Sequence, residues 1–458
     1  MRNDMAFSPA WELAQGIQQR MITSTDVVES VLQRINAYNS QVNAVVGVDI
    51  DDIRRQAREA DAKLIRDEGS GAIHGIPLTF KDTFETEGMR TTAGNPNLAD
   101  HIPAQDATVV ARLKEAGAII LGKTNVPPMA NGIQTDNPIF GRTNNPWNLE
   151  MTAGGSSGGA AAALATGMTL LDVGSDLGGS LRIPAHFCNV VALKPTEHLV
   201  PRAGHIPPVP GQPRLVRHLS VVGPMARTVT DLRMVLSIIA GPDYRTSETV
   251  PVPLNQVEEK PLSELRIAWA DSFPGVPASR ETRQAIERFA AALSQNGATV
   301  TRVLPQDFDF QAAWDIQERL VSMMVPDRRE QDAVEPTYAE YIDVLTEREH
   351  LIAIMDAFLT DWDILLCPVA PGPAFPHCEP GTQIPIDGEL IDYALMNAYC
   401  TVFNVTGSPS LVLPLALSDT GLPIGMQLVG KRWSDGNLLM IGEQLEAAMG
   451  ARPRPPGV

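Results

Sequence analysis

The sequence of 458 residues is poor in cysteine, in aromatic residues and in long apolar stretches. Four cysteines in so long a chain do not make a disulfide framework, so they indicate a reducing compartment. No stretch approaches the roughly 18 apolar residues that are needed to span a bilayer. No secretory signal is visible in the amino-terminal segment, which carries charges and lacks an apolar run. We therefore expect a cytoplasmic protein without a membrane segment.

Positive charge is also scarce. Lysine and arginine number 36 against 54 aspartates and glutamates, which gives a net charge of −18. A field of this sign repels phosphate groups and anionic lipids, so we expect no binding to nucleic acid or to membranes. The 44% of hydrophobic residues is ordinary for a globular protein, and the 36 glycines and 37 prolines indicate many loops.

Helical patterns alternate with short apolar strands along the chain. Apolar residues between Val28 and Ile35 follow the i, i+3, i+4, i+7 spacing of a helix, with Ser24 or Thr25 available as the N-cap. The other expected elements are helices over 51–67, 106–116 and 160–166, and strands over 76–80, 118–121, 169–173, 265–270, 411–415 and 425–429. This alternation favours an α/β architecture with a covered sheet.

A literal P-loop match lies at residues 117–124, GAIILGKT. The residues between its two glycines are apolar and typical of a strand, whereas a P-loop exposes backbone N–H groups there. Pro127 and Pro128 would also stop any helix that begins at Lys123. The sequence therefore predicts no nucleotide site at this match.

The segment 154–159, GGSSGG, fits the nucleophile-elbow pattern G-x-S-x-G through either Ser156 or Ser157. That interpretation requires a partner histidine, and His205 and His218 lie in loops that offer no supporting context. No set of cysteines and histidines has the two-sided spacing of a zinc site. We expect neither a metal nor an organic cofactor.

Two serines and one lysine stand in unusual settings. Ser156 lies inside the glycine-rich turn, Ser180 follows two glycines, and Lys81 ends the apolar run 74–80. Glycines beside a serine let the backbone approach a substrate, and successive N–H groups can form an anion-binding nest. Taken alone, Lys81 is better explained as a surface lysine at the end of a strand.

Residues 153–196, AGGSSGGAAAALATGMTLLDVGSDLGGSLRIPAHFCNVVALKPT, closely resemble the hallmark segment of the amidase signature family. Lys81 in GIPLTFKDTFETEG resembles the lysine motif of that family. Further agreement lies in GKTN (122–125), FGRTNNPWN (140–148), GPMARTVTDL (223–232), NVTGSPSLVLPL (404–415) and GLPIGMQLVG (421–430). The resemblance covers roughly residues 20–245 and 360–448, and no motif anchors 250–360.

The resemblance implies a Ser–cisSer–Lys triad. Ser180 is the nucleophile, Ser156 is the bridging serine and Lys81 is the base, with a cis peptide bond between Gly155 and Ser156. It also implies an oxyanion hole made by the backbone N–H groups of Leu177, Gly178, Gly179 and Ser180. Asp176 and Arg182, on either side of that loop, are then a structural ion pair.

The chemistry of such a triad sets a condition on the lysine. A serine hydroxyl is a weak nucleophile that needs a base, and an ammonium group cannot accept a proton. Lys81 must therefore be largely neutral, which burial achieves by lowering its pKa. Ser156 then relays the proton, backbone N–H groups stabilise the oxyanion, and water releases the acyl or carbamoyl group from Ser180.

The resemblance also implies the fold and the domain organisation. We expect an α/β protein of the amidase signature fold, with a large mixed central sheet covered by helices on both faces. Residues 1–458 form a single domain, in which 245–395 are a mostly helical, family-variable excursion that covers the substrate site. The proline-rich segment 201–213 is predicted to be an ordered flap or rim loop.

The segment 127–134 has no acidic residue where many members of the family carry one. We therefore predict an amidase that cleaves the linear C–N bond of a small uncharged carboxamide or carbamate (urethane), with urethanase or esterase side activity. The candidate substrate-binding residues are Ala130, Gly132, Ile133 and Gln134. The oligomeric state stays open, with a homodimer as one option.

Two other functions remain as alternatives. One is a glutamine-hydrolysing protein similar to the glutaminase component of the tRNA-dependent amidotransferase. We rank it second because the uncharged loop offers nothing to pair with the charged α-groups of glutamine. The other is a non-catalytic binding protein of the same fold, which the intact Lys81, Ser156 and Ser180 argue against.

Overall fold

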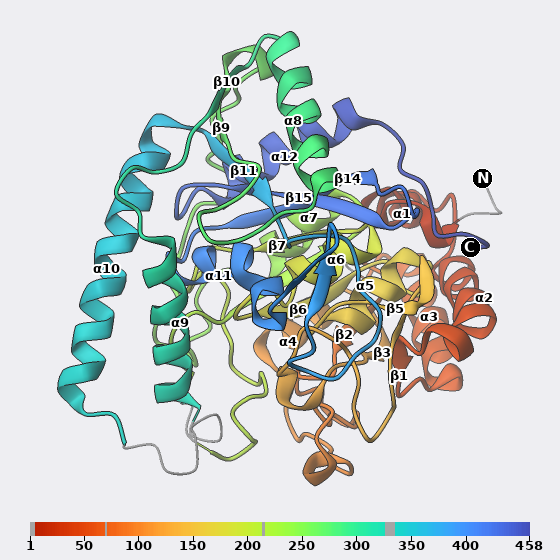
Figure 1. The fold of residues 1–458 in the computed structure, drawn as a ribbon. Coiled ribbons are helices and arrows are strands. Elements are labelled where there is room, and N and C mark those ends of the chain that lie inside the picture. Colours follow the sequence, from red (N-terminus) through yellow and green to blue (C-terminus); the bar gives the residue numbers. More distant parts are fainter. Residues whose placement is uncertain (1–4, 69–70, 213–215, 326–334) are drawn as a thin grey trace.

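The computed structural model describes residues 5–68, 71–212, 216–325 and 335–458. In this part of the chain, eleven strands form one mixed sheet in the order β1-β3-β2-β6-β8-β7-β14-β15-β11-β9-β10. Helices pack around it (Figure 1). The expected α/β fold with a large mixed sheet is confirmed.

The helices have the following bounds: α1 Ala10–Gln18, α2 Ser24–Val42, α3 Ile50–Ile65, α4 Thr108–Glu115, α5 Gly158–Ala165, α6 Arg182–Cys188, α7 Val229–Ile239, α8 Arg280–Gln295, α9 Phe310–Met324, α10 Tyr338–Asp361, α11 Ala398–Val405 and α12 Asp435–Met449. The strands have these bounds: β1 Val45–Val46, β2 Pro77–Lys81, β3 Ile119–Thr124, β4 Asn144–Asn145, β5 Asn148–Thr152, β6 Asp172–Asp176, β7 Val191–Lys194, β8 Val221–Ala226, β9 Arg266–Trp269, β10 Thr299–Arg302, β11 Ile364–Pro368, β12 Ile384–Ile386, β13 Glu389–Ile391, β14 Ser410–Leu417 and β15 Pro423–Val429.

Helix α2 begins slightly earlier than the sequence predicts. Thr23 is its N-cap and forms a capping box with Asp26, so the expected cap at Ser24 or Thr25 is wrong. The backbone N–H groups of Ser24 and Thr25 instead donate to the Asp61 carboxylate of α3, at 2.6 and 3.2 Å. Asp61, which is distant in the sequence, therefore binds the two residues that were expected to cap the helix.

Strand β6 lies near the centre of the sheet, parallel to β2 and antiparallel to β8. The apolar pattern predicted a strand over 169–173, whereas β6 continues to Asp176 through Gly174 and Ser175. The reason is pairing: all five residues of β6 are matched by β8, as far as Asp176 opposite Val221. Because β6 extends to Asp176, the sheet reaches almost to the glycines that precede Ser180.

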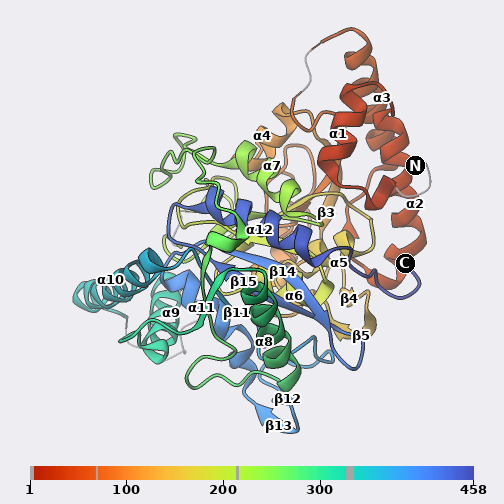
Figure 2. The same ribbon diagram turned by 90° about the horizontal axis from the view of Figure 1, so that it is seen from above.

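Helices cover both faces of the sheet. The alanine-rich helix α5 contacts β2, β3, β6 and β8, and α6 contacts β7, β14 and β15. Helices α7 and α12 pack against each other, and α12 lies across β14 and β15 from the side opposite to α6 (Figure 2). Buried apolar side chains fill the space between the layers.

The segment 245–395 is joined to the central sheet. It contributes helices α8, α9 and α10, and also β9 and β11, which pair in parallel, and β10 on the sheet edge. The sequence predicted one strand here, at 265–270, and missed β10, β11, β12 and β13. The exposed β10 has mixed polarity and carries little sequence signal, whereas β11 is a short apolar run that follows directly on the long helix α10.

No helix in the described part of the chain is both long enough and apolar enough to cross a membrane.

Candidate active site

Lys81 is the last residue of β2, between β3 and β6 in the sheet. Its side chain is 0% exposed. The Nζ atom donates to the hydroxyl of Ser156 at 2.7 Å and to the hydroxyl of Ser175 at 3.0 Å. The lysine therefore points into the protein, onto the serine of the glycine-rich turn.

Burial lowers the pKa of Lys81 to about 7, while the nearby carboxylates of Asp176 and Asp172 act in the opposite direction. Asp172 is itself fully buried, and burial raises its pKa to about 8. It accepts hydrogen bonds from the hydroxyls of Thr79 and Thr124, at 2.6 and 3.1 Å. A substantial fraction of Lys81 is neutral near pH 7, as a base requires.

The glycine-rich turn places Ser156 over the lysine. The Gly155–Ser156 peptide bond is cis, which confirms what the family resemblance implies. Gly155 is packed so closely that a Cβ atom would lie 2.7 Å from the backbone oxygens of Gly132 and Gln134. Glycine is required here because neighbouring backbone fills the space.

Ser180 lies in the loop between β6 and α6, next to the same turn. The backbone N–H of Ser157 donates to the carbonyl of Ser180 at 3.1 Å, which ties the two serine-bearing segments together. Ser180 is half-buried. Its hydroxyl makes no hydrogen bond within the described ranges of the chain. Ser156 contacts the lysine, and Ser180 is linked to the same turn through the backbone of Ser157.

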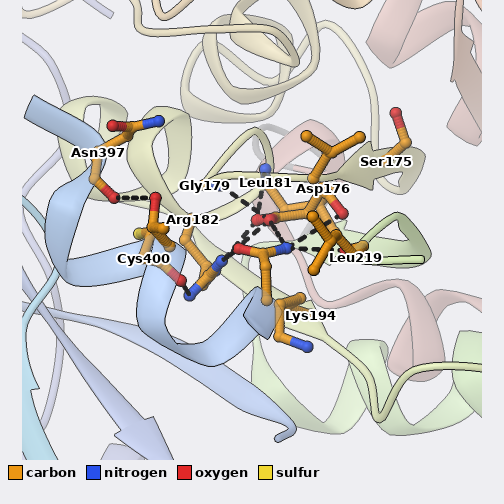
Figure 3. Close-up of polar contacts among 12 residues, drawn as sticks. Ser175, Asp176, Gly179, Leu181, Arg182, Lys194, Leu219, Asn397 and Cys400 are labelled. Carbon is orange, nitrogen blue, oxygen red and sulfur yellow. Dashed lines mark hydrogen bonds and ion pairs between the residues drawn. The ribbon is translucent and has the colours of Figure 1, made fainter. Parts of the chain in front are cut away.

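An ion pair between Asp176 and Arg182 shapes this loop (Figure 3). Both side chains are completely buried and lie 2.9 Å apart. Asp176 also accepts hydrogen bonds from the backbone N–H groups of Gly179 and Leu181, at 2.8 and 3.1 Å, and from Asn404 at 2.9 Å. Burial alone would raise the pKa of this carboxyl, but Arg182 and these hydrogen bonds hold it well below its usual range. The structural ion pair predicted from the resemblance is confirmed.

The loop also corrects one predicted member of the oxyanion hole. The N–H of Gly179 donates to Asp176 and is therefore not available to a substrate. The N–H groups of Leu177, Gly178 and Ser180 donate to no acceptor within the described residues. These three remain candidates for binding an oxyanion.

The candidate substrate residues lie on the loop that packs against Gly155. Ala130 has a positive φ of 57°, Gly132 has a φ of 149°, and Ile133 is half-buried. The side chain of Gln134 is turned to the segment that follows β11: it donates to the carbonyl of Cys378 at 2.7 Å and to the hydroxyl of Tyr393 at 3.1 Å. Gln134 thus links its own loop to the segment that contains Cys378 and Tyr393.

Residues that the sequence analysis set aside have structural partners. Lys123 lies within β3, and its ammonium donates to the carbonyl of Phe84 and to the hydroxyl of Thr86, so the P-loop match is a buried strand. The Nε2 atom of His218 lies 2.7 Å from the hydroxyl oxygen of Tyr341. Among the residues that the structure describes, no three histidine, cysteine or acidic side chains are grouped as metal ligands.

Sequence reasoning missed Ser175 and Asn404. Ser175 was assigned to no role, although its hydroxyl contacts the lysine. Asn404 lies 222 residues from Arg182 in the chain and contacts it directly. Asn404 begins one of the segments that resemble the family, and this was the available signal for its importance.

In this candidate site, a buried lysine contacts the serine of one glycine-rich segment, next to the glycine-rich segment that carries Ser180. A family model described as Amidase matches residues 26–350 and 326–439. The chain belongs to this family, the amidase signature enzymes, and is an amidase-type hydrolase.

Similar proteins cover the chain almost completely. One relative, a component of the glutamyl-tRNA(Gln) amidotransferase of Carboxydothermus hydrogenoformans, is 33% identical over 497 residues, which cover 97% of each chain. One similar solved structure is an inhibitor-bound vestigial protein complex that reveals the evolutionary origins of an s-triazine catabolic enzyme. Its matching chain has a TM-score of 0.85 and is 27% identical, and the match covers 98% of this chain and 100% of that one. A crystal structure of an amidase has a TM-score of 0.82 and 30% identity, over 97% and 100%.

Proposed function

We propose that this protein hydrolyses a carboxamide through an acyl-enzyme on Ser180. The observation that carries the proposal is the contact of 2.7 Å between the fully buried Lys81 ammonium nitrogen and the Ser156 hydroxyl, beside the loop that presents Ser180. A lysine whose pKa lies near 7 can accept a proton at neutral pH. The same two serines and lysine carry the resemblance of the sequence to the family.

In this mechanism the neutral Lys81 amine takes a proton from Ser156, which takes the proton of Ser180 as that oxygen attacks the amide carbon. The N–H groups of Leu177, Gly178 and Ser180 stabilise the oxyanion that forms. The proton returns through Ser156 to the leaving nitrogen, the C–N bond breaks, and an ester to Ser180 remains. Water then attacks this ester, with the same residues moving the proton, and regenerates the Ser180 hydroxyl.

Uncharged side chains around the serine loop favour a neutral substrate. Gln317 and Asn397 lie over Gly178, and the backbone of Gln134 packs against Gly155, next to Ser156. A polar but uncharged lining suits the hydrogen-bonding groups of an amide or carbamate better than an ion. A small uncharged carboxamide or urethane is therefore the substrate class that the geometry supports.

Glutamine is a second candidate, and the comparisons favour it. Relatives with 31% and 33% identity over nearly their whole length are components of glutamyl-tRNA(Gln) amidotransferases. In such a role this chain would release ammonia from glutamine and work with other proteins. The chemistry at Ser180 is the same in both cases, and the difference lies in whether the site pairs the charged α-groups.

One panel tests both candidates. The purified chain is incubated with glutamine, an aliphatic amide, an aryl amide and a carbamate, and the release of ammonia or amine is measured beside Ser180→Ala. Turnover of simple amides without glutamine hydrolysis supports the first candidate, and preferred hydrolysis of glutamine supports the second. Equal rates in wild type and Ser180→Ala would refute the acyl-enzyme itself.

A further inference from the structure

Gln317 is a buried polar residue of α9 that contacts the serine loop from outside every family motif. Its side chain is 6% exposed, and its Nε2 atom donates to the backbone carbonyl of Leu177 at 3.3 Å. A Cβ atom on Gly178 would lie 2.7 Å from the same Nε2 atom. Gln317 thus packs directly on the Leu177–Gly178 peptide.

The planar geometry of that peptide couples the direction of its carbonyl to the direction of its N–H. The bond between Leu177 and Gly178 is trans, so the Leu177 carbonyl and the Gly178 N–H point in opposite directions in one plane. Holding the carbonyl on one side therefore fixes the N–H on the other. The Gly178 N–H has no acceptor within the described chain, so it remains available to donate to a substrate.

The neighbouring peptides of the loop are held in a similar way by other elements. The carbonyl of Asp176, which precedes the N–H of Leu177, accepts from Asn404 at 3.4 Å. The carbonyl of Gly179, which precedes the N–H of Ser180, accepts from the N–H of Ile183 at 2.8 Å. Each carbonyl is tied down, and each following N–H is left open. Gln317 is the member of this set that comes from the segment without a family motif.

We propose that Gln317 is a positioning residue that aims the Gly178 N–H at the oxyanion of the transition state. This inference rests on the proposed acyl-enzyme at Ser180. Since an oxyanion forms only after attack, a misaimed N–H weakens the transition state more than the bound substrate. Loss of one oxyanion donor lowers kcat by about 10²–10³-fold, and losing its alignment is expected to lower kcat about tenfold or more.

The test compares Gln317→Met with Gln311→Met. Methionine keeps the length of glutamine and removes the donor, and Gln311 is an exposed residue of the same helix whose amide contacts Asp315. Kinetics are measured on the best amide of the panel, together with binding of its trifluoromethyl ketone analogue, which forms an oxyanion when Ser180 adds to it. We expect Gln317→Met to lose kcat and ketone affinity in parallel with KM nearly unchanged, and Gln311→Met to match wild type.

Two outcomes would overturn the inference: a higher KM with unchanged kcat, or unchanged ketone affinity. If Gln317→Met does not fold, Gln317→Glu is used instead, because it keeps the shape and replaces the donor by an acceptor. Its kcat, KM and ketone affinity are compared with those of the wild type in the same way. Ser180→Ala separates a failure of the proposed acyl-enzyme from a failure of the positioning role of Gln317. An inactive Ser180→Ala together with wild-type behaviour of the Gln317 variants refutes the positioning role and leaves the acyl-enzyme standing.

Discussion

Replacing Lys81 by methionine is expected to lower kcat/KM strongly and, at neutral pH, to stabilise the fold. The lysine has a pKa of about 7 in the folded protein and about 10.4 in an unfolded chain. Between these values the unfolded chain binds a proton that the folded protein does not, so the stability of the wild type rises with pH. Below pH 7 the folded protein holds a buried ammonium, and the wild type carries its full desolvation penalty.

The size of the effect follows from the two pKa values. A difference of about 3 units corresponds to about 4–5 kcal/mol. Methionine has a similar length and no charge, so the advantage of Lys81→Met is largest at or below pH 7 and shrinks by about this amount toward pH 10. Loss of the hydrogen bonds to Ser156 and Ser175 subtracts about 1 kcal/mol each, independent of pH.

Urea unfolding of wild type and Lys81→Met at several pH values between 6 and 10 measures this difference. The same pair in an Asp172→Asn background serves as the control, because it removes the titration of the neighbouring carboxyl. The variant is also expected to lose about 10²–10⁴-fold in kcat/KM. A stability difference that does not change with pH would refute a neutral Lys81, and near-normal kcat/KM would refute its role as base.

The other predictions concern the serines and the buried ion pair. Ser180→Ala is expected to lose both turnover and labelling by a fluorophosphonate, followed by mass spectrometry, whereas Ser156→Ala keeps slow labelling; a labelled Ser180→Ala protein would contradict the assigned nucleophile. Asp176→Asn leaves the Arg182 guanidinium buried without its carboxylate, so we expect about 3–5 kcal/mol less stability in urea unfolding. A loss below about 1 kcal/mol would show that the pair does not hold the loop.

Local sequence patterns predicted much of the central fold. Strand β2 and helix α3 were expected within two residues of their observed bounds, and the start of α2 within two residues as well. The end of β6 and the short strands β10 and β11 were not, because distant pairing partners define them. Strand propensity depends on the residues of the segment itself, whereas sheet pairing also depends on strands that are distant in the sequence.

The candidate site was predictable as a set of residues and not as a geometry. The glycine-rich motifs around Ser156 and Ser180 singled out the serines, and the family resemblance added Lys81 and the cis bond. The use of the Gly179 N–H by Asp176 depends on the conformation of the loop, and the approach of Gln317 from α9 depends on a contact across 140 residues that no spacing encodes. For that reason the sequence predicts no site residue within the segment 245–395.

The pH dependence of fluorophosphonate labelling tests the central claim most directly, since it needs no knowledge of the substrate. The second-order rate constant for modification of Ser180 in the wild type is measured from pH 5 to pH 9. A neutral, buried Lys81 predicts a rate that rises about tenfold per unit and levels off with a midpoint near pH 7. A rate that is flat across this range, or that is still rising steeply at pH 9, would contradict it.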